Sequence, residues 1–252
     1  MQDISKNRIL NVFGLIIIIS LMLSCGKGIK PKPHVLLITG GHSYDTTEFF
    51  ELFESFTEFE IDTLSQPTAN QFIGGGNAKK YDALVFYDYW QTISDKEKEA
   101  YLDLTVQGTG LLFLHHSLVS YLGWSDFSKI RGGLYPKSEP PDSINDGRYR
   151  HDIDLLVNIQ DTSHPVTKGM KDFMIHDEGY SNIRIFEGVS PLLKTSHPDC
   201  AELFGWTNQY NNSKVVYLMG GHDKLAYVNE NYKELIRNSM HYLVDRGEGS
   251  RE

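Results

Sequence analysis

The chain has 252 residues, of which 40% are hydrophobic and 23% are charged. This apolar content is enough for one globular domain with a sizeable core, and it excludes an intrinsically disordered chain. Acidic residues outnumber basic residues by 33 to 24, and the resulting net charge of −9 argues against nucleic acid as a partner, because phosphates need a basic surface.

The first segment has the residue order of a secretion signal. Lys6 and Arg8 precede the apolar run Val12–Leu23, and Ser24 and Cys25 follow it. The run is shorter than the ~20 apolar residues that a membrane-spanning helix needs, so we expect a cleaved signal; an uncleaved anchor helix is the alternative. The end of the run resembles a bacterial lipobox, which predicts a signal peptide over residues 1–24 and lipidation of Cys25.

These features predict a protein of the cell envelope, held in the membrane by its N-terminal lipid and facing the periplasm or the outside. Each buried methylene of an acyl chain contributes about 0.8 kcal/mol to such anchoring. Residues 25–33 would form a basic tether, residues 34–246 the α/β domain and residues 247–252 a polar tail. Cys200 would then be the remaining thiol, which excludes an internal disulfide and a cysteine-rich zinc site.

The body of the chain alternates between predicted strands and helices. Short apolar runs predict strands over residues 34–39, 59–64, 81–87, 110–114 and 214–219. Apolar residues at helical spacing follow the first strand, Ser94–Glu97 has the sequence of a capping box, and a final helix is expected over residues 229–244. Apolar strands that alternate with helices predict an α/β fold with a mainly parallel sheet and helices on both faces.

Residues 123–150 interrupt this alternation. The stretch includes the polar, proline-containing sequence EPPDSINDG, and we expect an inserted loop region over the ligand-binding edge of the sheet. A passive surface loop is the alternative. A further strand is predicted over residues 151–159.

Polar side chains follow several of the predicted strands, at the edge where parallel sheets bind ligands. His115 and His116 end the fourth strand, and His222 follows the last. One histidine at a strand end is usually structural, but several at one edge indicate a site. Neighbouring strand residues face opposite ways, so we expect one of His115 and His116 to point into it. The candidate substrate-binding residues are His42, Tyr44, Asp88, Trp90, Tyr180 and Asp223.

The adjacent acids Asp177 and Glu178 offer an acid/base pair or a metal carboxylate; a solvated acidic turn is the alternative. Neutral imidazole acts as a general base near pH 7 or binds a divalent metal such as zinc. The candidate metal ligands are His42, His116, Glu178 and His222, without a compact HExxH motif. His222 and Asp223 would otherwise only cap the turn before the final helix.

Two other kinds of chemistry are not expected. The loop TGGHSYDTTE matches neither GxGxxG nor GxxxxGK[ST], so no nucleotide cofactor is expected. Ser117 lacks the flanking glycines of a nucleophile elbow, so it is a poor candidate nucleophile.

An ordered set of segments resembles the trehalose-utilisation (ThuA-like) family. These segments are TGGHSYDTTEFF, YDALVFYD, GLLFLHHS, GWSDFSKIRGG, HPVTKGM, DEGY and KVVYLMGGHDKLAYVNENYKELIRNSMHYL. The resemblance implies a flavodoxin-like, doubly wound sheet of the class I glutamine amidotransferase type. Those amidotransferases carry a nucleophilic cysteine at the turn after the fourth strand, where this chain has His115 and His116, so amidotransfer is not expected.

Two classes of function follow. In the first, His115, His116, Asp177, Glu178 and His222 supply acid/base catalysis to a sugar hydrolase, lyase or isomerase acting on trehalose, a glucoside or a keto-sugar, with or without a metal. In the second, the same cleft binds a small carbohydrate without catalysis and passes it to a partner enzyme or transporter. Both are compatible with a homo-oligomer or with partner proteins of a sugar pathway.

Overall fold

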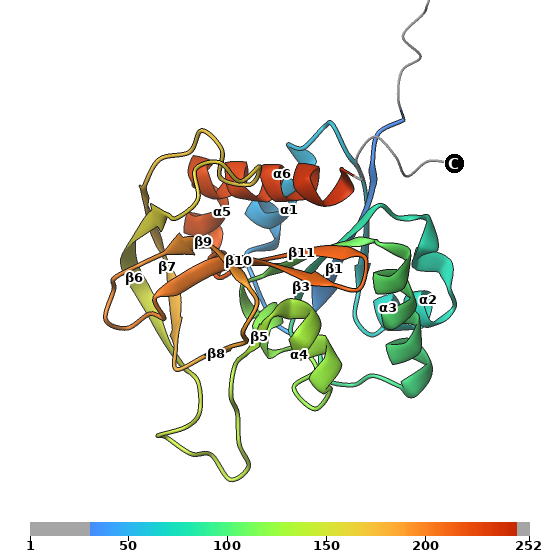
Figure 1. The fold of residues 1–252 in the computed structure, drawn as a ribbon, viewed down its shortest axis with the longest axis horizontal. Helices are drawn as coiled ribbons and strands as arrows, with labels where there is room; N and C mark the ends of the chain where they lie inside the picture. The colour runs from blue at the N-terminus through green and yellow to red at the C-terminus, as the bar shows by residue number, and fades with distance from the viewer. Residues whose placement is uncertain (1–30, 246–252) are drawn as a thin grey trace, which may run out of the picture. The chain divides into compact units, whose positions relative to one another are not determined.

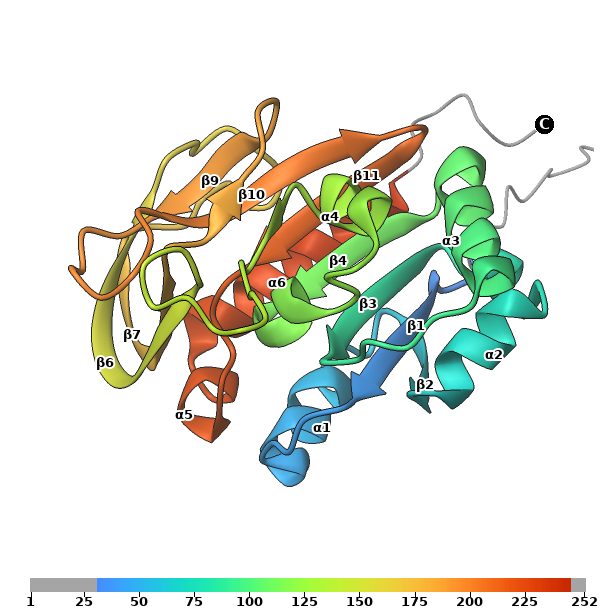
Figure 2. The same ribbon diagram turned by 90° about the horizontal axis from the view of Figure 1, so that it is seen from below.

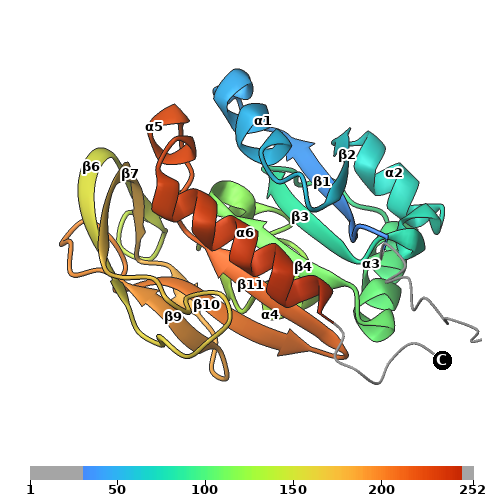
Figure 3. The same ribbon diagram turned by 90° about the horizontal axis from the view of Figure 1, so that it is seen from above.

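The computed structural model describes residues 31–245. The predicted signal peptide, Cys25 and the polar tail lie outside the described residues. A nine-stranded sheet has the order β2-β1-β3-β4-β11-β10-β9-β6-β7. Helices cover both of its faces, with α1 and α6 on one side and α3 and α4 on the other (Figures 1, 2 and 3).

One half of the sheet is a parallel core. β1 pairs in parallel with β2 and with β3, and β4 pairs in parallel with β3 and with β11. β3 and β4 are buried along their whole length, as their unbroken apolar sequences predict. The predicted α/β fold with a parallel sheet is therefore confirmed. The bounds are β1 His34–Gly40, β2 Glu60–Ser65, β3 Ala83–Asp88, β4 Gly110–Leu114 and β11 Ser213–Leu218.

The other half of the sheet is antiparallel. From β11 outward, each strand runs opposite to its neighbour. β6, which includes the predicted strand over residues 151–159, alternates between exposed and buried positions over much of its length, because only one of its faces packs on the core. The bounds are β6 Arg148–Ile159, β7 Phe173–Ser181, β9 Ser190–Lys194 and β10 Leu203–Tyr210; β5 Gly133–Leu134 and β8 Arg184–Ile185 form a separate pair.

The helices begin where capping side chains are available. The Ser94 hydroxyl accepts from the backbone N–H of Glu97, and the Glu97 carboxylate accepts from that of Ser94, so the predicted capping box is present. The Asn229 side chain caps the final helix. The bounds are α1 Thr46–Glu54, α2 Thr68–Gly74, α3 Asp95–Gln107, α4 Ser125–Arg131, α5 Lys224–Tyr227 and α6 Glu230–Val244, with 3₁₀ helices at Asn77–Lys80 and His115–Val119.

The stretch 123–150, expected as an inserted loop, is only partly one. Its first part forms α4, which buries Phe127 and Ile130 and packs near β10 and β11. The helix follows Trp124, which makes no side-chain cap, so the usual start signal is missing from the sequence. Among the described residues, no helix is long and apolar enough to cross a membrane.

Candidate active site

The site lies at the carboxyl ends of the parallel strands. β4 ends at Leu114, and His115 follows with a positive φ of 45°, a left-handed conformation that is uncommon for a residue other than glycine. The buried guanidinium of Arg131 holds the following 3₁₀ helix, because it donates to the carbonyl oxygens of Ser117 at 2.5 Å and Ser120 at 3.2 Å. Arg131 therefore fixes the turn that carries the two histidines.

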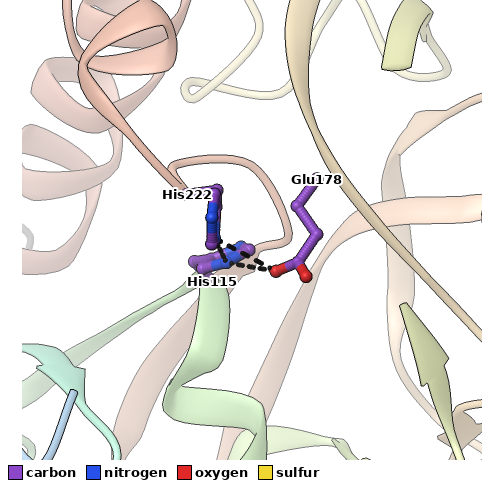
Figure 4. A group of neighbouring side chains, drawn as sticks. All are labelled: His115, Glu178 and His222. Carbon is purple, nitrogen blue, oxygen red and sulfur yellow. Dashed lines mark hydrogen bonds and ion pairs between the residues drawn. The ribbon is translucent and has the colours of Figure 1, made fainter. Parts of the chain in front are cut away.

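Three side chains from three different elements meet here (Figure 4). His115 Nε2 lies 3.0 Å from Glu178 Oε2, and His222 Nδ1 lies 3.2 Å from each of these two atoms. His115 comes from the end of β4, Glu178 from β7 and His222 from the turn after β11. We call these three residues the triad. The side chains of His115 and Glu178 are buried, whereas that of His222 is 24% exposed.

The backbone fixes the orientation of the His115 ring. His115 Nδ1 lies 2.8 Å from the carbonyl oxygen of Met219, which only accepts hydrogen bonds, so Nδ1 carries a proton. Nε2 therefore faces the other two triad residues, and the Tyr180 hydroxyl lies 3.1 Å from it. Of the two adjacent histidines, His115 is therefore the one that lies with His222 and Glu178.

Glu178 is the common partner of the histidines. Its second oxygen, Oε1, lies 3.3 Å from Nδ1 of His151, on the neighbouring strand β6. Burial raises the pKa of Glu178, but its hydrogen bonds with His115 and His222 outweigh this and lower the pKa well below its usual range. The hydrogen bond to Glu178 in turn raises the pKa of His222. Glu178 is thus ionised at neutral pH.

The neighbouring acid Asp177 has a different setting. Its carboxylate accepts the backbone N–H groups of Gly221 at 2.7 Å, His222 at 2.9 Å and Glu178 at 2.8 Å. Burial raises the pKa of Asp177. A Cβ at Gly220 would lie 2.9 Å from Asp177 Oδ2, so the glycine leaves room for this contact. Predicted as catalytic, Asp177 instead ties the His222 turn to β7.

His116 points into a cavity beside the triad. Its ring stacks on that of His42 at 4.8 Å and lies edge-on to Tyr87 at 4.3 Å, and neither ring nitrogen makes a hydrogen bond in the described structure. Burial and then the neighbouring His115 lower the pKa of His116 well below its usual range. His42 is exposed, with Nδ1 2.6 Å from the carbonyl oxygen of Ser43.

Two cavities meet at the site. The first, of about 400 Å³, is lined by histidines, by Glu178, by four tyrosines and by the loop of the inserted region, and we call it the tyrosine-lined cavity. The second, of about 510 Å³, includes Asp45 and Asp223 in its lining, and we call it the aspartate-lined cavity. The residues common to both are His42, His151 and His222. The tyrosines of the first cavity are Tyr89, Tyr135, Tyr149 and Tyr180.

The loop after α4 therefore lies over the ligand-binding edge of the sheet, as expected. Pro136, Lys137 and Gly147 of this loop are among the residues that line the tyrosine-lined cavity. Tyr44 and Asp223 line the aspartate-lined cavity, and Asp223 also caps α5 by accepting the N–H of Leu225 at 2.8 Å. This hydrogen bond is the turn-capping role that the sequence offered as the alternative for Asp223.

Asp88 and Trp90, predicted to bind substrate, line neither cavity. Asp88 is fully buried, and its oxygens accept from Gln66 at 2.9 Å and from the Ser120 hydroxyl at 3.0 Å. Burial raises the pKa of Asp88 to about 6. Its place at the end of β3 serves an internal hydrogen-bond network rather than the cavity.

The parallel core has a fold of the class I glutamine amidotransferase-like type, with the two histidines at the turn after β4. PurLQS from Thermotoga maritima shares this fold, with 13% identity and a TM-score of 0.55. The match covers 84% of the present chain and 100% of the PurLQS chain. Within this class, the chain belongs to the ThuA family, described as trehalose utilisation, whose model matches residues 34–243.

Two solved ThuA-like structures agree in fold. A ThuA-like protein from Parabacteroides merdae is 17% identical, with 85% of this chain and 90% of that chain covered and a TM-score of 0.69. One from Bacteroides uniformis is 18% identical, with 86% and 94% covered and a TM-score of 0.66. No curated protein matches the chain.

Proposed function

We propose that this protein is an enzyme that acts on a small carbohydrate, with the triad moving protons at the reacting sugar. The observation that carries the proposal is a buried, ionised carboxylate shared by two histidines beside a tyrosine-lined cavity. Histidine and carboxylate pairs of this kind supply general acid/base catalysis. Membership in a family described as trehalose utilisation supports a sugar as the substrate.

Each triad residue has a part that follows from its position. His222 is the most exposed of the three and lines both cavities, so it exchanges a proton with a sugar hydroxyl or glycosidic oxygen. Glu178 orients the His222 ring and stabilises its charged form. His115, held by Met219, contacts the same carboxylate oxygen as His222 and helps to fix its position.

The two cavities suit a sugar of two units. Each has a volume within the ~300–1,000 Å³ range of small-molecule sites. Tyrosine rings pack on the apolar faces of one sugar ring, while Ser43, Asp45 and Asp223 accept hydrogen bonds from the hydroxyls of the other. The bond between the units would then lie over the shared histidines.

The test is incubation of the purified protein with trehalose, other glucosides and their 3-keto forms, followed by chromatography. Turnover by the wild type that falls by about 10²–10⁴-fold in Glu178→Gln supports the proposal. The matched control is His176→Ala, which removes a histidine that pairs with the exposed Asp154 rather than with the triad.

Binding without turnover, measured by calorimetry, would instead support a non-catalytic sugar-binding component that serves a partner enzyme or transporter. Neither binding nor turnover with any of these sugars would overturn the proposal.

We further propose that the protein is anchored in the cell envelope through a lipid on Cys25. The signal-like order of residues 1–25 supports this. Fractionation of cells expressing Cys25→Ser tests it: the variant should leave the membrane fraction, whereas a variant that stays there means that the apolar run is an anchor helix.

A further inference from the structure

We propose that His115, Glu178 and His222 bind a divalent transition-metal ion. This rests on the proposed function for its catalytic meaning and changes one role in it: with the ion bound, water or a sugar hydroxyl on the ion, rather than the His222 ring, would give up the proton. The proposal is argued from the donor atoms alone. The three side chains in Figure 4 point at one another from three elements, and their donor atoms all lie within 4.8 Å of one another.

The three donor atoms converge on one another. His115 Nδ1 donates to Met219, so Nε2 is the ring nitrogen that faces the Glu178 carboxylate, at 3.0 Å. His222 Nδ1 lies 3.2 Å from both atoms. A single proton on Nε2 satisfies only one of these contacts, whereas one cation between the three donors satisfies all of them.

The spacing of the three donors matches a metal site. Metal–nitrogen and metal–oxygen bonds of about 2.1 Å place neighbouring ligand atoms about 3.0 Å apart in an octahedral site and about 3.4 Å apart in a tetrahedral one. The three edges of the triad, at 3.0, 3.2 and 3.2 Å, fall in this range. No rearrangement of the backbone is needed to bring the donors together.

The surroundings supply the support that metal ligands usually have. A ligating histidine typically donates its second N–H to a backbone carbonyl or carboxylate, as His115 does to Met219. The second oxygen of Glu178 is held by His151 at 3.3 Å, and the backbone of His222 is held by Asp177. All three ligands are thus oriented by neighbours.

The donor set selects the kind of ion. Two imidazole nitrogens and one carboxylate oxygen suit zinc and neighbouring transition metals, whereas calcium and magnesium prefer oxygen ligands throughout. Three protein ligands leave a position for water or substrate, as in catalytic zinc sites. Glu178 and His222 both line the tyrosine-lined cavity, so a sugar hydroxyl in that cavity reaches the open position.

The test uses the full chain without a histidine tag, freed of metal with a chelator and titrated with Zn²⁺ and with Co²⁺. We expect one ion per chain by elemental analysis and a Co²⁺ absorption spectrum typical of nitrogen and oxygen ligands. His222→Ala should weaken binding by about 100-fold or more, since loss of even a supporting partner costs ~10–100-fold. His176→Ala, which alters a histidine beside Asp152 and Asp154, should bind like the wild type.

Binding that is absent in the wild type, or equal in the wild type and in His222→Ala, overturns the proposal and leaves a cluster of three side chains that holds no ion. Should His222→Ala fail to fold by circular dichroism, Glu178→Gln takes its place in the same titration. Absence of metal binding together with sugar turnover by the metal-free protein would overturn the metal site and keep the proposed function; metal binding without sugar turnover would do the reverse.

Discussion

Two buried polar clusters lie at the carboxyl ends of the parallel strands, and they use their hydrogen-bonding groups differently. In the first, which we call the Asp88 network, the Gln66 amide nitrogen lies within hydrogen-bond distance of Asn70, Asp88 and the Tyr121 hydroxyl, which share its two N–H groups, and Ser120 donates to Asp88. In the triad, two imidazole rings and a carboxylate converge instead.

The side chains of the Asp88 network bond to one another, and the carboxylate at its centre is fully buried and lines neither cavity of the site. The triad instead borders a cavity through Glu178 and His222. The comparison shows that buried polar residues at a strand end indicate a functional site when they also line a cavity.

The largest effect on folding should come from the Asp88 network. Gln66→Ala leaves Asn70, Asp88 and Tyr121 without their shared donor, and it should lower the free energy of unfolding by about 3–5 kcal/mol. His222→Ala, in the triad, should change it by about 1 kcal/mol or less, because that side chain is partly exposed. Urea denaturation of both variants measures the contrast, and equal losses would erase the distinction between the clusters.

The Asp88 network should also give stability a particular pH dependence. Burial raises the pKa of Asp88 to about 6, above the ~3.9 of an unfolded chain, so Asp88 stabilises the folded state fully below pH 4 and loses that contribution as the pH rises through 6. The shift corresponds to about 3 kcal/mol. Asp88→Asn should therefore gain stability relative to the wild type between pH 4 and 7, as seen in urea titrations at several pH values.

A constant difference between Asp88→Asn and the wild type across that range would show that the carboxyl titrates normally. The comparison is internal to one pair of proteins, so other titrating groups cancel.

The smallest effect concerns His116, whose ring nitrogens make no hydrogen bonds. His116→Leu removes two buried polar atoms at similar volume and should raise the free energy of unfolding by about 1–2 kcal/mol while weakening sugar binding. His115→Leu should instead lower stability, because it breaks the bonds to Met219 and Glu178. A loss of stability in both variants would mean that His116 is held by the fold as firmly as His115.

The parallel core could be predicted from the sequence because β1, β3, β4 and β11 are apolar runs, whereas β2, at the edge of the sheet, is only partly buried. The same logic gathered His115 and His222 as candidates, since a parallel sheet brings distant strand ends together. Glu178 was a candidate as one of two adjacent acids expected on a loop at this edge, but it lies inside the antiparallel strand β7. The sequence could not separate Glu178 from Asp177, because the register of β7 depends on its antiparallel pairing with β6, which has no local signal.

His151 was missed for the same reason. It begins the predicted strand over residues 151–159 and lies two residues from Ile153, which is buried on one face of β6. That spacing was the available signal, but the pairing of β6 with β7 is irregular between Arg150 and Ile153, and Asp152 has a positive φ of 55°. Such irregularities depend on the partner strand rather than on the local pattern.

The three backbone amides bound by Asp177 give the site a mechanical property. The Asp177 carboxylate lies on the strand that carries Glu178 and accepts hydrogen bonds from the turn that carries His222. We therefore expect this strand and this turn to move together as one rigid unit. Widening of the tyrosine-lined cavity must then come from its other lining residues, such as those of the loop that includes Tyr135 and Gly147. Changes in that loop would alter which molecules enter without disturbing the alignment of the reacting groups.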